Sequence, residues 1–131
     1  MEFPVVDGLR ALELGSEGSM RRRLNELVLA GLKRATAATL DDYDANEFEH
    51  VGERLALVDD ELNRIGVVEV TGTELTTFGA VPWSFAAAEN EGDESIGDWR
   101  RGHRGFWEAQ AMQVREDMPV FLIYFSLAEV P

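Results

Sequence analysis

The stretch RLALVDDELNRIGVVEVTGTEL, residues 54–75, contains two apolar segments separated by a short polar one. Its first five residues and the segment Ile65–Leu75 are rich in valine, leucine, isoleucine and threonine, most of which favour β-strands. The polar residues Asp59–Arg64 between them have the composition of a turn. The pattern predicts a β-hairpin, and Gly66 and Gly72 in its second strand indicate a bulge or bend that curves the sheet.

An amphipathic helix is predicted before this hairpin, over Met20–Leu32. Its apolar residues recur at three- and four-residue spacing, and they are Met20, Leu24, Leu27, Val28 and Leu32. Ser19 is suited to cap the start of the helix, and Gly31 is suited to end it. We then expect Lys33–Thr36 in a turn and Ala37–Leu40 at the beginning of a strand.

The C-terminal half predicts two helices and a last strand. Pro82 suits the first turn of a short helix, and the polar segment Asn90–Glu94 follows it. Ser95, with an acid three residues later, indicates the cap of a second helix. Its inward-facing side chains are expected to be Ile96, Trp99, Phe106 and Trp107, as part of the core. Pro119–Leu127 reads as an apolar strand, so the order of elements predicts one α+β domain over residues 1–131.

Composition limits the classes of protein to consider. The chain has 131 residues, 45% of them hydrophobic, which suits one globular domain with its own core. The absence of cysteine excludes disulfides and thiolate chemistry, and two histidines offer little to a transition metal, so we expect no metal or other cofactor. No apolar run approaches the ~20 residues of a membrane span, and the N-terminus lacks a signal-peptide pattern. We expect a soluble cytoplasmic protein with no membrane partner.

The charges are unevenly distributed along the chain. Acids outnumber bases by 25 to 12, and the net charge of -13 argues against a protein that coats long nucleic acids. Eight of the bases fall in two short windows, and they are Arg21, Arg22, Arg23, Lys33, Arg34, Arg100, Arg101 and Arg104. If these windows meet in the fold, they form a cationic cleft for a small anionic ligand. Otherwise they are solvated helix faces.

Three short segments contain residue types that carry chemistry. They are Gly31-Leu32-Lys33-Arg34-Ala35-Thr36, Glu89-Asn90-Glu91-Gly92-Asp93 and Trp99-Arg100-Arg101-Gly102-His103. A lysine and a threonine three residues apart are able to face one cavity, where a partly buried lysine takes the hydroxyl proton. A nearby carboxylate would orient the lysine or activate water for attack on an amide. The alternative is an ordinary ion pair between Lys33 and Glu89, with Thr36 merely starting a strand.

At these segments the sequence resembles the ASCH domain family, named for homology to activating signal cointegrator, a branch of the PUA-like fold. Typical members carry G-x-K-x-x-T after the first helix, then a hairpin, then F-A-x-x-E-G-x-G-D-x-S and W-R-x-x-H. Order and spacing agree from Glu13 to Ser126. Asn90 replaces the usual glycine, but asparagine also tolerates a left-handed backbone. The resemblance implies a small PUA-like β-barrel with helices packed around a cleft that binds a nucleoside or an RNA-derived ligand.

One bacterial branch of the family hydrolyses the acetyl amide of N4-acetylcytidine with a lysine, a threonine and a glutamate. The resemblance implies Lys33, Thr36 and Glu89 in these roles, with Glu91 as the competing acid. Two mechanisms stay open: Thr36 is the nucleophile and Lys33 its base, or Glu89 activates water while Lys33 and Arg34 hold the oxyanion. The ligand-binding residues that we expect besides this trio are Arg34, Tyr43, Glu91, Arg100 and His103.

Other family members are proposed to bind or cleave RNA. In such a function Trp83 would stack on a base, and phosphates would be held by Arg22, Arg34, Arg100 and Arg104. Tyr43 would close over the ligand as a lid, and His103 either faces the ligand or pairs with an acid. A third possibility is an interaction domain without chemistry. The excess of acids favours hydrolysis of a small nucleoside amide over binding of long RNA.

Overall fold

The computed structural model describes residues 4–43 and 47–130, so part of the acidic loop expected over residues 41–49 lies outside the described residues. Within these ranges the chain forms three α-helices, two short 3₁₀ helices and one sheet of six strands. The strands are β1 Val5–Val6, β2 Leu9–Leu12, β3 Ala35–Thr39, β4 Arg54–Val58, β5 Arg64–Thr77 and β6 Pro119–Glu129. The helices are α1 Ser19–Leu29, η1 Leu40–Asp42, η2 Phe78–Ala80, α2 Trp83–Glu89 and α3 Ile96–Glu108.

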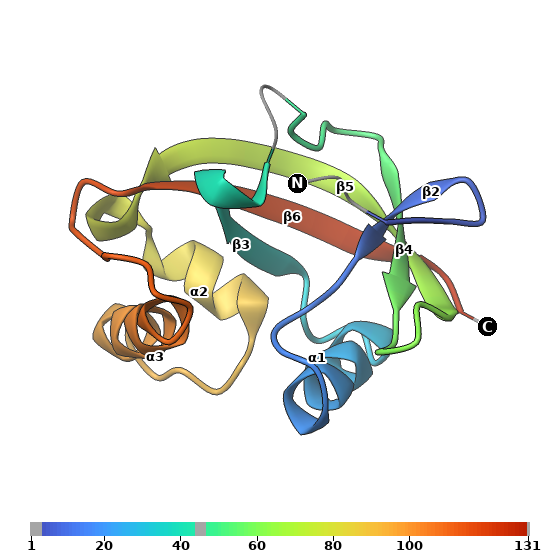
Figure 1. Cartoon of the computed structure of the whole chain (residues 1–131), viewed down its shortest axis with the longest axis horizontal. Helices are drawn as coiled ribbons and strands as arrows, with labels where there is room; N and C mark the ends of the chain where they lie inside the picture. The colour runs from blue at the N-terminus through green and yellow to red at the C-terminus, as the bar shows by residue number, and fades with distance from the viewer. Residues whose placement is uncertain (1–3, 44–46, 131) are drawn as a thin grey trace.

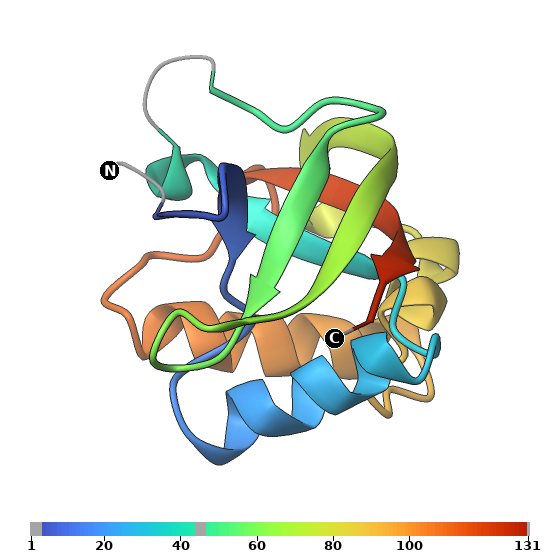
Figure 2. The same ribbon diagram turned by 90° about the vertical axis from the view of Figure 1, so that its right-hand side faces the viewer.

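The six strands form a curved sheet in the order β1-β2-β4-β5-β6-β3, with every pair antiparallel except β2 and β4. The three α-helices lie on one side of this sheet, α1 below one end and α2 with α3 below the other (Figure 1). Figure 2 shows how strongly the sheet curls around them. The α+β class is as predicted, but β1 and β3 stay unpaired with each other, so the sheet is open and the expected barrel is not closed.

The predicted hairpin is confirmed and supplies β4 and β5, in which Leu55 is paired with Val68. The register of β5 against β6 shifts between Val70 and Gly72, which is the bulge that the glycine indicated. Gly66 also lies at an irregularity, since the register of β4 against β5 shifts directly after its pairing with Leu57. A Cβ atom at Gly66 would in addition lie 3.1 Å from Leu29 Cδ2 and 3.2 Å from a β6 carbonyl oxygen. This glycine lets the end of α1 approach the sheet closely.

The strands β1 and β2 were not predicted from the apolar pattern because each is very short. The turn between them was nevertheless visible in the sequence as Asp7-Gly8. Both residues have positive φ, 53° and 79°, as a tight hairpin turn with the native twist requires. This hairpin continues the sheet beyond β4, since β2 pairs in parallel with β4.

Helix α1 ends at Leu29, three residues before the predicted Leu32, and Gly31 lies in the turn that terminates it, as the pattern indicated. The amide of Gly31 bonds to the Val28 carbonyl and that of Leu32 to the Leu27 carbonyl, both at 2.9 Å, with Gly31 at φ 76°. These are the paired bonds of a Schellman motif, which reverses the chain. Gly18, rather than Ser19, is the N-cap, without a side-chain cap.

The start of α3 agrees with the sequence prediction, whereas the starts of α2 and β3 differ from it. Ser95 caps α3 as predicted, accepting a bond of 3.1 Å from the amide of Asp98. Pro82 is the N-cap of α2 rather than its first helical residue. β3 begins at Ala35, so Thr36 lies in a strand and not in the expected turn. The Schellman reversal uses fewer residues than the predicted turn, which lets the strand start earlier.

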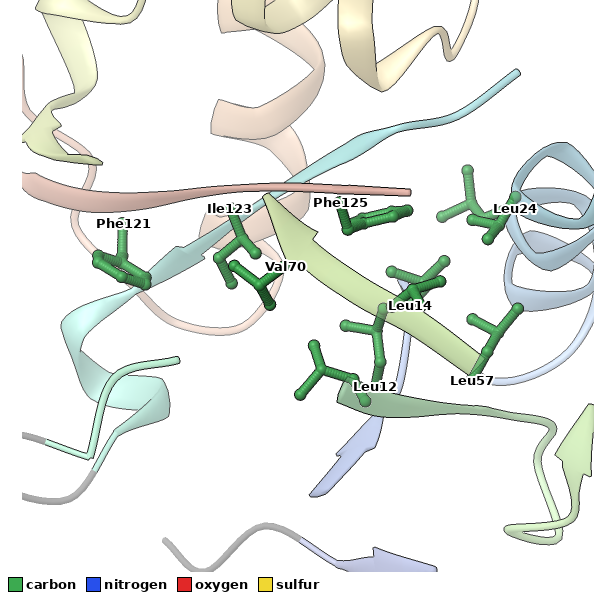
Figure 3. Close-up of a cluster of buried hydrophobic side chains, with 11 residues drawn as sticks. Leu12, Leu14, Leu24, Leu57, Val70, Phe121, Ile123 and Phe125 are labelled. Carbon is green, nitrogen blue, oxygen red and sulfur yellow. The ribbon is translucent and has the colours of Figure 1, made fainter. Parts of the chain in front are cut away.

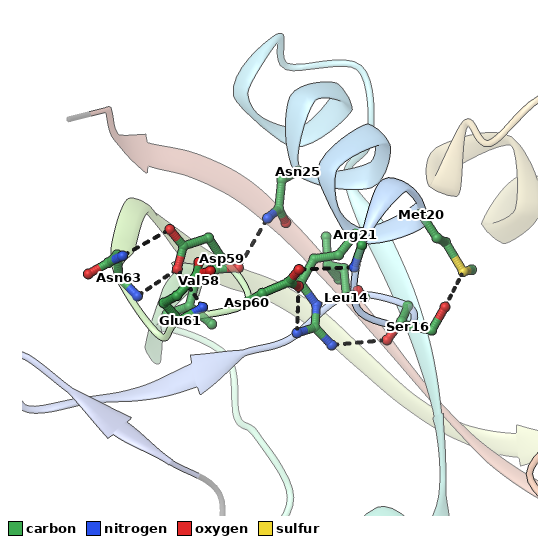
Figure 4. Close-up of polar contacts among 12 residues, drawn as sticks. Leu14, Ser16, Met20, Arg21, Asn25, Val58, Asp59, Asp60, Glu61 and Asn63 are labelled. Atoms are coloured by element: carbon green, nitrogen blue, oxygen red, sulfur yellow. Dashed lines mark hydrogen bonds and ion pairs between the residues drawn. The ribbon is translucent and has the colours of Figure 1, made fainter.

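The core has two main clusters, and alternate residues of β6 contribute to each of them. One lies between α1 and the strands and includes Leu24, Leu57, Val70 and Phe121 (Figure 3). The other packs α2 and α3 against the sheet and includes the buried Trp99 and Trp107, as predicted. Burial of these side chains supplies the main free energy of folding and fixes how α1, α2 and α3 face one another. No helix within residues 4–43 and 47–130 combines the length and apolar character needed to cross a membrane.

Candidate functional site

A cavity of about 240 Å³ lies where the three helices meet the free edge of the sheet. Its lining comes from the loop before α1, from α1, β3, α2 and the segment after it, and from α3. The lining residues are Gly15, Met20, Arg23, Leu24, Thr36, Ala37, Glu89, Glu91, Asp93, Gly102, His103, Phe106 and Trp107. The cavity therefore contains residues from all three chemistry-bearing segments of the sequence, although these are far apart along the chain.

Lys33 lies beneath this cavity with only 1% of its surface exposed. The reversal at Gly31 turns its side chain into the protein. Its Nζ donates to the Ala35 carbonyl at 2.7 Å, to Glu89 Oε2 at 3.2 Å and to Glu91 Oε2 at 2.5 Å. An ammonium group has three N–H bonds, and here each has an acceptor. Lys33 is thus a buried cation between two carboxylates, with an acceptor for each N–H. These contacts offset the free-energy cost of removing its charge from water.

Glu89, the last residue of α2, is almost completely buried and bonded through both oxygens. Lys33 binds Oε2, while the indole N–H of Trp99 donates to Oε1 and His103 Nε2 lies 3.3 Å from the same atom. Burial alone would raise the pKa of Glu89, but the charge of Lys33 and the contacts with His103 and Trp99 outweigh it and lower the pKa to about 2. Glu89 is therefore an ionised anchor for its neighbours.

Glu91 is the second carboxylate on Lys33 and has a more open position. Asn90 adopts a left-handed conformation, φ 53° and ψ 46°, and its Nδ2 donates to the Leu32 carbonyl at 3.0 Å. This turn directs Glu91 back toward Lys33. Burial raises the pKa of Glu91 and the Glu89 charge adds to the rise, although Lys33 opposes it. Of the two acids, Glu91 has the raised pKa and is therefore the one better suited to accept a proton.

His103 lies on the α3 wall with its ring stacked on Trp99 at 4.0 Å between centroids. Its Nδ1 lies 3.1 Å from the Trp99 carbonyl oxygen and its Nε2 faces Glu89. Burial lowers the pKa of His103, but the hydrogen bond and charge of Glu89 outweigh that effect and raise it. The sequence left open whether His103 faces the ligand or pairs with an acid; in the structure it pairs with Glu89 and also lines the cavity.

A second cavity of about 220 Å³ lies beside the first, and its lining includes Thr36 and Tyr43. Thr36 lines both, and no hydrogen bond within the described residues engages its hydroxyl. In the second cavity the Tyr43 hydroxyl donates to Glu49 at 2.8 Å. Burial, with the charge of Glu49, raises the pKa of Tyr43 well above its usual range, and burial also raises the pKa of Glu49. Together the two cavities reach the roughly 300–1,000 Å³ typical of small-molecule sites.

Three of the arginines assigned to ligands or phosphates lie elsewhere. Arg34 is exposed, and neither it nor Arg100 lines either cavity. The Arg100 guanidinium donates to the carbonyls of Gly79 and Val81, and Arg104 donates to that of Val114. Because three acids line the first cavity against Arg23 and His103, it is not the cationic cleft that the basic windows predict.

The polar residues of these cavities that the sequence did not single out as site residues include Arg23, Glu49 and Asp93. Burial raises the pKa of Asp93, and the nearby Glu89 charge adds to that rise. Asp93 was within a quoted motif, but Glu49 has no local signal because its burial depends on strands distant in sequence. Within the described residues no group of three or more histidine or acidic side chains is arranged to hold a metal ion.

The fold and this cavity define a PUA-like α+β domain with an ionic cluster under a cleft. The sequence model of the ASCH domain matches residues 10–129, so the chain belongs to the ASCH domain family. Among curated proteins, none matches the chain.

Solved structures with a similar fold include two at 25% sequence identity. The ASCH domain from Lactobacillus crispatus has a TM-score of 0.78, over 91% of this chain and 79% of that one. A protein from Enterococcus faecalis also has a TM-score of 0.78, over 90% of this chain and 75% of that one. A ZmASCH variant from Zymomonas mobilis, 10% identical with a TM-score of 0.53 over 80% of this chain and 63% of that one, shares the fold alone.

Proposed function

We propose that this protein hydrolyses N4-acetylcytidine or a related N4-acylated cytosine to the free amine and a carboxylic acid. One observation carries the proposal. The buried Lys33 binds both Glu89 and Glu91 beneath a cavity that is lined by these two acids and by Thr36, whose hydroxyl is unbonded among the described residues. This arrangement supplies a nucleophile, a base and a proton acceptor to one small ligand. The acidic lining favours an uncharged nucleoside over a phosphorylated one.

Glu91 gives Lys33 a route to act as a base. Lys33 passes a proton to Glu91 Oε2, whose raised pKa suits it to receive one, and the neutral amine then takes the proton of Thr36. The Thr36 oxygen forms a bond to the acyl carbon, and the C–N bond breaks as Lys33 returns its proton to the leaving nitrogen. Water then hydrolyses the Thr36 ester, releasing the acid and restoring the hydroxyl.

The competing mechanism, in which Glu89 activates water, fits the geometry less well. Both Glu89 oxygens are already bonded, and the lowered pKa makes this carboxylate a weak base. Arg34, which would hold the oxyanion in that mechanism, lies outside the cavity. We therefore assign Glu89 to holding Lys33 and His103 in place.

The RNA-binding alternative loses two of its proposed phosphate contacts. Arg100 and Arg104 are engaged with backbone carbonyls, so they are not free to hold a strand of RNA. Trp83 is 43% exposed and Arg22 is exposed, but neither lines either of the two cavities. A salt titration of RNA binding checks this alternative, since phosphate contacts make affinity fall steeply with salt.

The test is hydrolysis of N4-acetylcytidine and of other N4-acylcytosines, followed by chromatography. Thr36→Val keeps the shape of the side chain and removes the hydroxyl, so the rate should fall roughly 100-fold or more. Thr73→Val, on an exposed part of β5, is the matched control and should keep the wild-type rate. Glu91→Gln should also lose most of the rate. An inert wild-type protein, or a fully active Thr36→Val variant, would refute the proposal.

A further inference from the structure

β3 is an edge strand, and its free edge borders the two cavities. In an antiparallel pair, successive residues turn their N–H and carbonyl groups alternately toward the partner strand and away from it. The Phe125 amide of β6 donates to the Arg34 carbonyl at 3.0 Å, so Arg34 and Thr36 face β6. The outward-facing residues are therefore Ala35, Ala37 and Thr39.

Two hydrogen bonds agree with this assignment and occupy the groups on either side of Ala37. Lys33 Nζ binds the Ala35 carbonyl at 2.7 Å, and the Thr39 amide donates to Asp42 Oδ2 at 3.0 Å. Between these groups stand the N–H and the carbonyl of Ala37. Within the part of the chain that the structure describes, no hydrogen bond reaches either of them, and Ala37 lines both cavities.

An unbonded N–H beside an unbonded carbonyl in a cavity favours a ligand with the complementary groups, because a ligand that shields these groups from water must replace the hydrogen bonds that water would make. We infer that the Ala37 backbone binds the edge of the ligand's base. The Ala37 N–H would donate to an acceptor atom of the base, and the Ala37 carbonyl would accept from a neighbouring N–H of the base. The N3 atom and the N4–H group of cytosine form such an edge. The choice of a cytosine ligand rests on the proposed function.

The small number of unbonded backbone groups beside the cavities favours a base over a peptide as the ligand. Adding a peptide strand to a sheet uses several consecutive outward groups. Here Lys33 binds the Ala35 carbonyl and Asp42 binds the Thr39 amide, so between these two occupied groups only one donor and one acceptor, both of Ala37, are left. A single planar ring needs no more than this. Because Ala37 directly follows Thr36, a base bound there also has the Thr36 hydroxyl beside it.

The experiment is an NMR titration of the ¹⁵N-labelled protein with cytidine, the product of the proposed reaction. The Ala37 amide proton should move downfield and exchange more slowly with solvent as cytidine binds. 3-Deazacytidine lacks the N3 acceptor and should bind about tenfold more weakly. Ala37→Pro removes the N–H at an edge position that tolerates proline, and it should weaken cytidine binding to a similar extent. Thr73→Val, on an exposed part of β5 outside both cavities, is the control and should bind cytidine as the wild type does.

The outcomes separate this inference from the proposed function. If cytidine binds without moving the Ala37 amide, or if 3-deazacytidine binds equally well, the inference is wrong even where N4-acetylcytidine is hydrolysed. If cytidine moves the Ala37 amide while N4-acetylcytidine stays intact, the base edge is supported and the hydrolase is refuted. A shift caused by an extended peptide and not by cytidine would overturn the assignment of the edge to a base.

Discussion

The imidazole Nε2 of His103 lies 3.3 Å from Oε1 of Glu89, the oxygen that Lys33 leaves to other donors. The contact brings a second cationic group to a carboxylate that is already ionised. It couples α3 to the end of α2, and through Glu89 to Lys33. The stability of the fold should therefore depend on the charge of this histidine.

The pH dependence of unfolding checks that coupling. The pKa of His103 is raised above 6.5 in the folded protein, so the folded state holds the proton more tightly than the unfolded chain. Its contribution is fully present below pH 6.5 and is lost as pH rises through the raised pKa. The unfolding temperature should fall over that window in the wild type. His103→Gln should remove the fall, while the exposed His50→Gln should retain it; an unchanged slope in His103→Gln would contradict the prediction.

The indole of Trp99 should matter beyond its packing. Trp99→Phe keeps an aromatic ring in the core but deprives Glu89 of the Trp99 N–H donor. Leaving a buried charged group short of a partner costs about 1–3 kcal/mol. Trp107→Phe, at a similarly buried position with no such bond among the described residues, is the control for lost ring volume. Urea denaturation should show the larger loss of unfolding free energy in Trp99→Phe, and equal losses would count against a stabilising bond.

A variant without the charge of Lys33 should become more stable as the pH falls. Lys33→Met leaves Glu89 and Glu91 buried without their shared cation, at a cost of about 3–5 kcal/mol near neutral pH. The two carboxyl groups would then bind protons more readily when folded than when unfolded, so stability should rise as pH falls. Thermal unfolding from pH 7 to pH 4.5 follows this, with the double variant Lys33→Met, Glu91→Gln expected to recover part of the loss. A variant that loses stability with falling pH would contradict the expectation.

Two substitutions at Asn90 separate the effect of backbone strain on stability from the effect of the side-chain hydrogen bond. Asn90→Ala must place an alanine at φ 53° and should lose about 1–2 kcal/mol, together with the bond to the Leu32 carbonyl. Asn90→Gly accepts the same backbone conformation and loses only the bond. Chemical denaturation of both variants should therefore rank the alanine variant as less stable. Equal stability would mean that the left-handed conformation carries no strain.

Much of the fold was predictable because local patterns and local caps determine it. The hairpin of β4 and β5, the turn at Gly31 that terminates α1 and the Ser95 cap of α3 each follow from a few neighbouring residues. β1 and β2 were missed because strands this short have no measurable period. That the barrel stays open was not predictable, because closure depends on whether two distant edges pair, which no local pattern contains.

The site was predictable in part, for a related reason. The motifs named Lys33, Thr36, Glu89, Glu91 and His103, and all five lie in or under one cavity. The roles of the arginines were harder to predict, because the sequence does not distinguish an arginine that binds a phosphate from one that binds a backbone carbonyl. Arg100 belongs to the second kind. Which acid has a lowered pKa and which a raised one depends on burial and on the neighbouring charges, and therefore on the complete fold.

The pairing of β3 with β6 has a consequence for the order of folding. Ala35 is in register with Tyr124, and β6 is the only strand beside β3 in the described sheet. During synthesis β3 and the loop that holds Lys33 emerge early, yet they have no neighbouring strand until β6 has left the ribosome. The hairpin of β4 and β5 is local and is able to form first. The cleft should then be assembled last, as a late, long-range step that ties the C-terminal strand to the first third of the chain.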